Sequence, residues 1–111
     1  MKKIIVLMCG AAVSTVLASG AAVAGNPDAG KEKAKTCATC HGPDGNGAPT
    51  IPDAPKLAGQ HADYLIKALQ GYKAGTRKNP IMAPMAAPLS QRDIEDLAAF
   101  YSRQPGLTTF K

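Results

Sequence analysis

The sequence predicts an all-α domain in which three to five short helices are separated by long loops. Apolar residues recur at helical spacing in two stretches, residues 61–73 and 94–101. Two segments lie outside the predicted helices: residues 42–55, where glycine and proline concentrate, and residues 77–89, where proline recurs. No stretch alternates apolar with polar residues in the way that a half-buried strand does. These observations argue against a sheet and favour a small helical domain.

The first 24 residues are expected to be a signal peptide that is cleaved after Ala24 during export. Lys2 and Lys3 give it a positive start, and residues 4–18 are apolar or small throughout. This apolar run is too short to be a membrane anchor. Cys9 lies too early for a lipoprotein site, so we expect it to leave with the signal peptide.

The remaining residues, 25–111, are predicted to form one small domain. A chain this short buries little apolar surface, and such domains often depend on a disulfide, a metal or a cofactor. The sequence carries a formal net charge of +5, but two of its lysines lie in the signal peptide, so the domain is only weakly basic. It has no basic run with interleaved aromatic residues, and nucleic acid is not an expected partner.

The first helix is predicted to begin at Asn26 and Pro27, a capping residue followed by a proline whose missing N–H costs nothing at a helix start. Residues 28–40 are rich in Ala, Lys and Glu and suit the body of this helix. The second helix covers residues 61–73, and Gly75 ends it. Its predicted buried face consists of Tyr64, Leu65, Ala68, Leu69 and Tyr72.

The last helix is predicted to begin after Ser90, and Asp93 three residues later resembles the second half of a capping box. Pro105 and Gly106 end it. The inner stripe of this last helix is predicted to be Ile94, Leu97, Ala98 and Tyr101.

Loops as long as residues 42–55 are unusual in a compact domain unless something holds them in place.

The pattern Cys37-Ala38-Thr39-Cys40-His41 is typical of covalent haem attachment. Two thiols three residues apart at the end of a helix lie on one side and can add to the two vinyl groups of one porphyrin. The histidine that follows then lies under the iron and offers an imidazole nitrogen. A covalent haem would also give the long loops an object to fold around.

Other uses of the two cysteines fit the sequence less well. Half of a zinc site would lack its other half, because His61 is the only further histidine and no cysteine remains after signal cleavage. A thioredoxin-like dithiol requires a βαβ context, which this sequence lacks.

The second axial ligand of the iron distinguishes an electron carrier, in which the protein fills this position, from an enzyme, in which the position stays open. A methionine sulfur fills this position in electron carriers and raises the reduction potential. Met82 and Met85 are the candidates, both in the proline-bounded segment before the last helix. His61 is a weaker candidate, and a loop methionine can also act as apolar filling.

The ordered set of motifs resembles class I cytochromes c, most closely the small bacterial periplasmic monohaem cytochromes and one half of their two-haem relatives. The resemblance covers nearly all of residues 25–111. It rests on CATCHG at residues 37–42, PKLAGQ at 55–60, GTR at 75–77, IMAPMAAPLS at 81–90 and DIEDLAAFY at 93–101.

This resemblance implies a cytochrome c fold wrapped around one covalent haem c. It implies a methionine ligand eight residues before the serine that caps the last helix, which is Met82, with Met85 as the fallback. It also implies that a proline carbonyl accepts a hydrogen bond from the second ring nitrogen of His41, which fixes the tautomer of that histidine. Pro55 is the expected proline and Pro52 the second choice.

Three further expectations follow from the resemblance. Leu57 would pack on the haem face. Gly30 would let the last helix cross the first closely, with Phe100 or Tyr101 in the contact. Arg77 would pair with a haem propionate or remain a solvated loop residue.

The resemblance implies a periplasmic one-electron carrier with His/Met-ligated low-spin iron, and not an enzyme. Its expected partners are membrane or periplasmic oxidoreductases, with no membrane insertion after signal cleavage and a monomeric state. Lys33, Lys35, Lys56 and Lys73 could steer an acidic partner. Two alternatives remain: a haem-binding subunit of a larger oxidoreductase complex, and an open-site haem enzyme or sensor.

Overall fold

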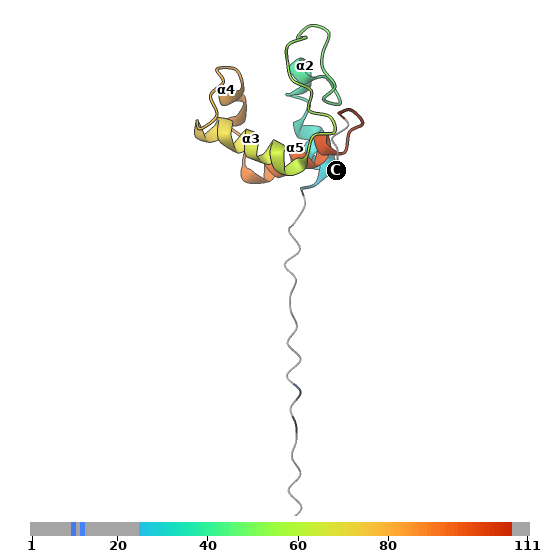
Figure 1. The fold of residues 1–111 in the computed structure, drawn as a ribbon, viewed down its shortest axis with the longest axis vertical. Helices are drawn as coiled ribbons and strands as arrows, with labels where there is room; N and C mark the ends of the chain where they lie inside the picture. Colours follow the sequence, from blue (N-terminus) through green and yellow to red (C-terminus); the bar gives the residue numbers. More distant parts are fainter. Residues whose placement is uncertain (1–9, 11, 13–24, 108–111) are drawn as a thin grey trace, which may run out of the picture.

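The computed structural model describes residues 10, 12 and 25–107. Apart from positions 10 and 12, the predicted signal peptide, including Cys9, lies outside these residues. Within the described residues no strand forms, and a single isolated bridge pairs Ala48 with Ile51. The all-α prediction is confirmed. The helices are α1 (Pro27–Lys33), α2 (Ala38–His41), α3 (Ala62–Ala74), α4 (Met82–Ala86) and α5 (Gln91–Ser102) (Figure 1).

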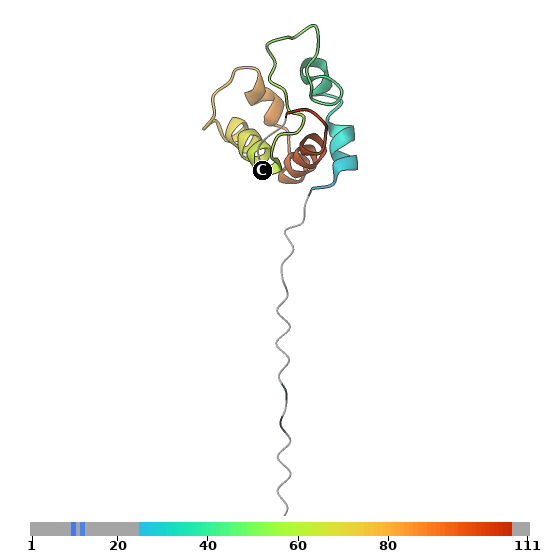
Figure 2. The same cartoon turned by 45° about the vertical axis from the view of Figure 1, so that its right-hand side comes forward.

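The helices α3 and α5 pack together, and α2 and α4 stand on opposite sides above them (Figures 1 and 2). The core lies along α5, whose predicted inner stripe of Ile94, Leu97, Ala98 and Tyr101 is buried throughout. This arrangement places the end of α2, which carries His41, opposite the start of α4, which carries Met82.

The close contact of α1 with α5 depends on Gly30. A Cβ atom at position 30 would lie 1.9 Å from the carbonyl oxygen of Asp96 and 2.9 Å from the Cβ of Phe100, so only glycine fits. The expected close crossing is confirmed, with Phe100 in the contact. Asp96 also accepts a hydrogen bond from the backbone N–H of Asn26 (2.7 Å), which fixes the start of α1 on the same helix.

The segment predicted as one helix over residues 28–40 is divided in two. Residues 34–37 form a turn between α1 and α2, where the N–H of Lys35 bonds to the carbonyl of Glu32 three residues earlier (3.4 Å). Thr36 and Cys37 are weak helix formers, which favours a tightened turn here. The chain then resumes as α2 and ends at Gly42, whose φ of 81° suits glycine.

The proline-rich segment 77–89, expected to be a loop, contains the helix α4. The Asn79 side chain accepts hydrogen bonds from the N–H groups of Ile81 and Met82, both at 2.9 Å, and so supplies the missing partners of the first turn. Pro84 lies in that first turn, where its missing N–H breaks no helical bond. The prolines therefore delimit and start a short helix.

The predicted buried face of α3 is only partly buried. Leu65 is buried in the core, but Tyr64 is 48% exposed. The reason is geometrical: Leu65 packs against α5, whereas Tyr64 lies at the mouth of a cavity that this face also lines.

Gly30→Ala is expected to lower the unfolding free energy of the haem-loaded protein by about 1–3 kcal/mol, the usual cost of overpacking a close contact. Denaturant unfolding measures this directly. Lys31→Ala, on the exposed side of the same helix, is the control and should change stability by less than about 0.5 kcal/mol. Equal stability of Gly30→Ala and the wild type would contradict the close crossing.

The capping box of α5 gives a pH-dependent contribution to stability. The N–H of Ser90 donates to the Asp93 carboxylate (3.0 Å) and Lys33 pairs with it (3.1 Å), and together they hold the pKa of Asp93 below its usual value. A depressed pKa stabilises the fold above the unfolded value near about 3.9, and this contribution is lost as the pH falls through the folded value.

The Asp93→Asn variant should therefore unfold at a lower denaturant midpoint than the wild type at neutral pH. The difference between the two midpoints should become smaller as the pH falls below about 4, because the wild-type carboxylate is then protonated. A difference that stays constant across this pH range would show that the ionised form of Asp93 contributes nothing.

Candidate haem site

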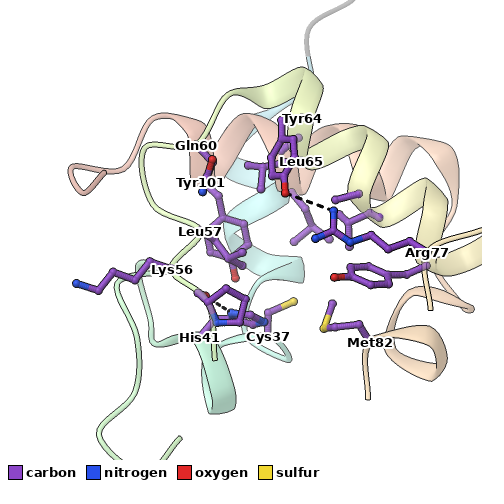
Figure 3. A pocket seen from close by; sticks show the side chains of 16 residues that line it. Cys37, His41, Lys56, Leu57, Gln60, Tyr64, Leu65, Arg77, Met82 and Tyr101 are labelled. Carbon is purple, nitrogen blue, oxygen red and sulfur yellow. Dashed lines mark hydrogen bonds between the residues drawn. The ribbon is translucent and has the colours of Figure 1, made fainter. Parts of the chain in front are cut away.

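A cavity opens between α3, α5 and the segments that carry α2 and α4 (Figure 3). Its volume, including the open mouth, is about 740 Å³. Apolar side chains dominate its wall, as in most cofactor sites. Four residues predicted from the sequence as site residues meet here with Cys37, namely His41, Pro55, Leu57 and Met82.

His41 lies at the end of α2 and is only 6% exposed. Its Nδ1 lies 2.8 Å from the carbonyl oxygen of Pro55. A carbonyl can only accept, so Nδ1 carries the proton and donates, while Nε2 keeps a free lone pair for a metal. The predicted contact with Pro55 is confirmed. Pro52, the second choice, lines a separate hollow of the loop and does not reach this cavity.

The loop after α2 brings Pro55 and Leu57 back over His41. The carbonyl of Gly45 accepts hydrogen bonds from the N–H groups of Leu57 (2.7 Å) and Ala58 (3.1 Å). The N–H of Gly47 donates to the carbonyl of His41 (2.8 Å). These bonds join both ends of the loop, which explains how so many glycine and proline residues keep a fixed path.

Cys37 and Cys40 are both half-buried and are not joined by a disulfide. Cys37 lines the cavity, while Cys40 lies on α2 directly before His41 and is not among the lining residues. Burial raises the pKa of the Cys37 thiol, although the neighbouring Tyr101 hydroxyl lowers it. The Cys37 sulfur therefore lies partly buried at the cavity wall, beside the Tyr101 hydroxyl.

The structure distinguishes between the two methionines that are candidates for the second axial ligand. Met82 lines the cavity and its side chain faces His41 from the opposite wall (Figure 3). Met85 is 39% exposed and is not among the lining residues. His61, the weaker candidate, is exposed at the start of α3 and does not line the cavity. The arrangement favours the pair His41 and Met82.

Lys73 has a structural role that the sequence did not reveal. Its ammonium donates to the carbonyls of Ala87 (2.9 Å) and Leu89 (2.6 Å), just beyond α4. We predicted Lys73 as a steering residue, but this contact ties its charge to the segment that carries Met82. A lysine in the last turn of a helix is too common to signal such a contact.

Arg77 lies at the cavity mouth between two tyrosines of α3. Its guanidinium is 5.0 Å from the centroid of the Tyr72 ring and donates to the hydroxyl of Tyr64 (3.3 Å). Cation–π contact of this kind holds an exposed arginine in place. Its pairing with a haem propionate remains a prediction.

The residues present fit a covalent haem better than the alternatives. Within residues 25–107 no group of three or more His, Cys, Asp or Glu side chains is placed to hold a metal ion, so the zinc alternative has no ligand set. The dithiol alternative requires a sheet, and none forms in the part of the chain that the structure describes. None of the helices in the described part of the chain is long and apolar enough to span a membrane.

An all-α domain that places the histidine of a CxxCH pattern in an apolar cavity defines the class of c-type haem proteins. A family model described as cytochrome c matches residues 27–102. The chain belongs to the cytochrome c family, and its cofactor is covalently bound haem c.

Two curated relatives and one solved structure show the same relationship. Cytochrome c4 of Thiocapsa roseopersicina is 49% identical over 82 residues, which cover 73% of this chain and 41% of that protein. Cytochrome c-554(548) of Halomonas halodenitrificans is 46% identical and aligns over 73% of this chain and 99% of its own length. The crystal structure of reduced cytochrome c4 from Pseudomonas stutzeri superposes with a TM-score of 0.69 at 46% identity, covering 76% of this chain and 48% of that one.

The chain thus spans less than half the length of the cytochromes c4 and nearly the whole of the shorter relative. It is similar to one half of the longer proteins, as the sequence predicted.

Lys73→Ala is expected to accelerate amide hydrogen exchange in α4 by roughly fivefold, because the loss of its hydrogen bonds costs about 1 kcal/mol. Exchange monitored by NMR on the haem-loaded protein tests this. Lys67→Ala removes an exposed lysine from the same helix and should leave α4 unchanged. Equal exchange in both variants would mean that Lys73 does not hold this segment.

Proposed function

We propose that this protein is a periplasmic monohaem electron carrier whose iron is ligated by His41 and Met82. The observation that carries the proposal is the placement of these two side chains on opposite walls of one apolar cavity. An iron with both axial positions filled by protein has no position for a substrate. The protein would therefore act by electron transfer and not as an enzyme.

In this proposal, the chain holds and tunes the cofactor. Cys37 and Cys40 would carry it as thioethers, and Leu57 would pack on its face. When bound, the haem supplies an iron that alternates between the ferrous and ferric states and so carries one electron. The Pro55 carbonyl keeps the Nδ1 proton of His41 in place, which presents Nε2 to the iron and increases its basicity.

Fixed ligands favour electron transfer because little has to rearrange when the charge of the iron changes. His41 is held by the Pro55 hydrogen bond, and the segment of Met82 is held by Lys73 at one end and Asn79 at the other. Both axial side chains would thus stay in place through each redox cycle.

The proposed location is based on the composition of residues 1–24, and the proposed partners are based on the exposed lysines. Residues 1–24 would act as a cleaved signal peptide that delivers the chain to the periplasm, where it would work as a monomer. Its partners would be membrane or periplasmic oxidoreductases. Lys33 pairs with Asp93 and Lys35 with Glu32, so Lys56, exposed at the cavity rim, is the better candidate for steering an acidic partner.

A second possibility is a haem-binding subunit of a larger complex. The observation that favours it is that the relatives named cytochrome c4 are more than twice as long as the matched segment. Gel filtration of a periplasmic extract separates the two: a small free species supports the shuttle, and comigration with a large complex supports the subunit.

Met82→Ala in the haem-loaded protein is expected to abolish the weak near-infrared band of sulfur-to-iron ligation and to let the ferrous protein bind carbon monoxide. The wild type should show the band and resist carbon monoxide, because its sixth position is filled. Absorption spectra with and without the gas measure both properties.

Met85→Ala is the matched control, since it removes the same side chain from the same short helix outside the cavity. It should keep the band and exclude carbon monoxide. Ready binding of carbon monoxide by the wild type would overturn the carrier proposal in favour of an open-site enzyme or sensor. Loss of the band in Met85→Ala, and not in Met82→Ala, would reassign the ligand.

A further inference from the structure

Tyr101 holds a buried hydroxyl that the proposed ligand set does not use. The residue lies in the last turn of α5 and is 3% exposed. Its hydroxyl oxygen is inaccessible to solvent and makes no hydrogen bond of normal geometry among the described residues, although the Cys37 thiol lies close enough to affect its pKa. Burying an unpaired hydroxyl is costly, so native proteins rarely keep one without a purpose.

The position of the Tyr101 ring is fixed by its surroundings. Gly45 leaves the space for it, because a Cβ atom there would lie 2.8 Å from the Cδ1 of the ring. The carbonyl of Tyr101 accepts a hydrogen bond from the N–H of Gly59 (3.0 Å), and the ring packs against Phe100 with centroids 5.0 Å apart. The hydroxyl therefore cannot swing out to water without disrupting α5 and the loop.

The hydroxyl points into the haem cavity beside Cys37 (Figure 3). Burial is the main cause that raises the pKa of Tyr101 well above its usual value, and the neighbouring Cys37 thiol raises it further. The phenol thus remains protonated and able to donate at any physiological pH. A sulfur atom is a weak acceptor, and a thioether has no proton of its own, so its only role toward a phenol is to accept.

We propose that the Tyr101 hydroxyl donates a hydrogen bond to the Cys37 sulfur when that sulfur carries the porphyrin as a thioether. The inference rests on the proposed attachment of haem through Cys37. A donor at this sulfur draws electron density from the edge of the ring and disfavours the electron-poor ferric state, which raises the reduction potential. Tyr101 is in this sense a positioning and tuning residue, and not an iron ligand.

Tyr101→Phe tests the proposal because it removes only the hydroxyl. In the haem-loaded variant we expect a lower reduction potential, a lower denaturant midpoint and a shifted thioether C–S stretching band in the resonance Raman spectrum. In heavy water the same band should shift in the wild type and not in the variant. Tyr64→Phe, which removes a hydroxyl bonded to Arg77 away from Cys37, should leave the C–S band unchanged.

Three results would overturn the inference. One is a Tyr101→Phe variant with unchanged potential and C–S band. The second is a variant that is more stable than the wild type, since removing a truly unpaired hydroxyl relieves its burial cost. The third is an equal shift of the C–S band in Tyr64→Phe. The mass of each sample shows whether haem is attached, so failure of attachment is distinguished from failure of the Tyr101 hydrogen bond.

Discussion

The close packing of α1 against α5 at Gly30 is the constraint on which the rest of the structure depends. The backbone of α1 approaches the Asp96 carbonyl so closely that no side chain fits between them. Because only the short turn of residues 34–37 separates α1 from α2, this contact fixes where Cys37 and His41 lie relative to α5. Tyr101 lies in the last turn of the same helix α5, so the contact at Gly30 helps to position both the attachment motif and the buried phenol.

The second fixed point is the hydrogen bond between His41 and the Pro55 carbonyl. It joins the end of α2 to the far end of a loop that has no regular structure of its own. The Gly45 carbonyl holds the same loop from the other side through Leu57 and Ala58. A long irregular segment can thus form one wall of the cavity, opposite the wall that Met82 and the Lys73 contacts provide.

Most of the fold was predictable from the sequence because its signals are local. Helical spacing located α3 and α5, and the CxxCH pattern located His41. The short helix α4 was missed because its start depends on the Asn79 side chain, while its prolines resemble those of a loop. The exposed position of Tyr64 and the contacts of Lys73 depend on how segments distant in sequence pack, which spacing alone does not encode.

The central claim is that this domain is built around a haem held by Cys37 and Cys40. Intact mass spectrometry of the exported protein, expressed together with haem-attachment machinery and treated with a thiol-alkylating reagent, tests it most directly. We predict the mass of the processed chain plus one haem, with neither cysteine alkylated. A processed chain of bare polypeptide mass, or one that takes up the reagent at both cysteines, would contradict the claim.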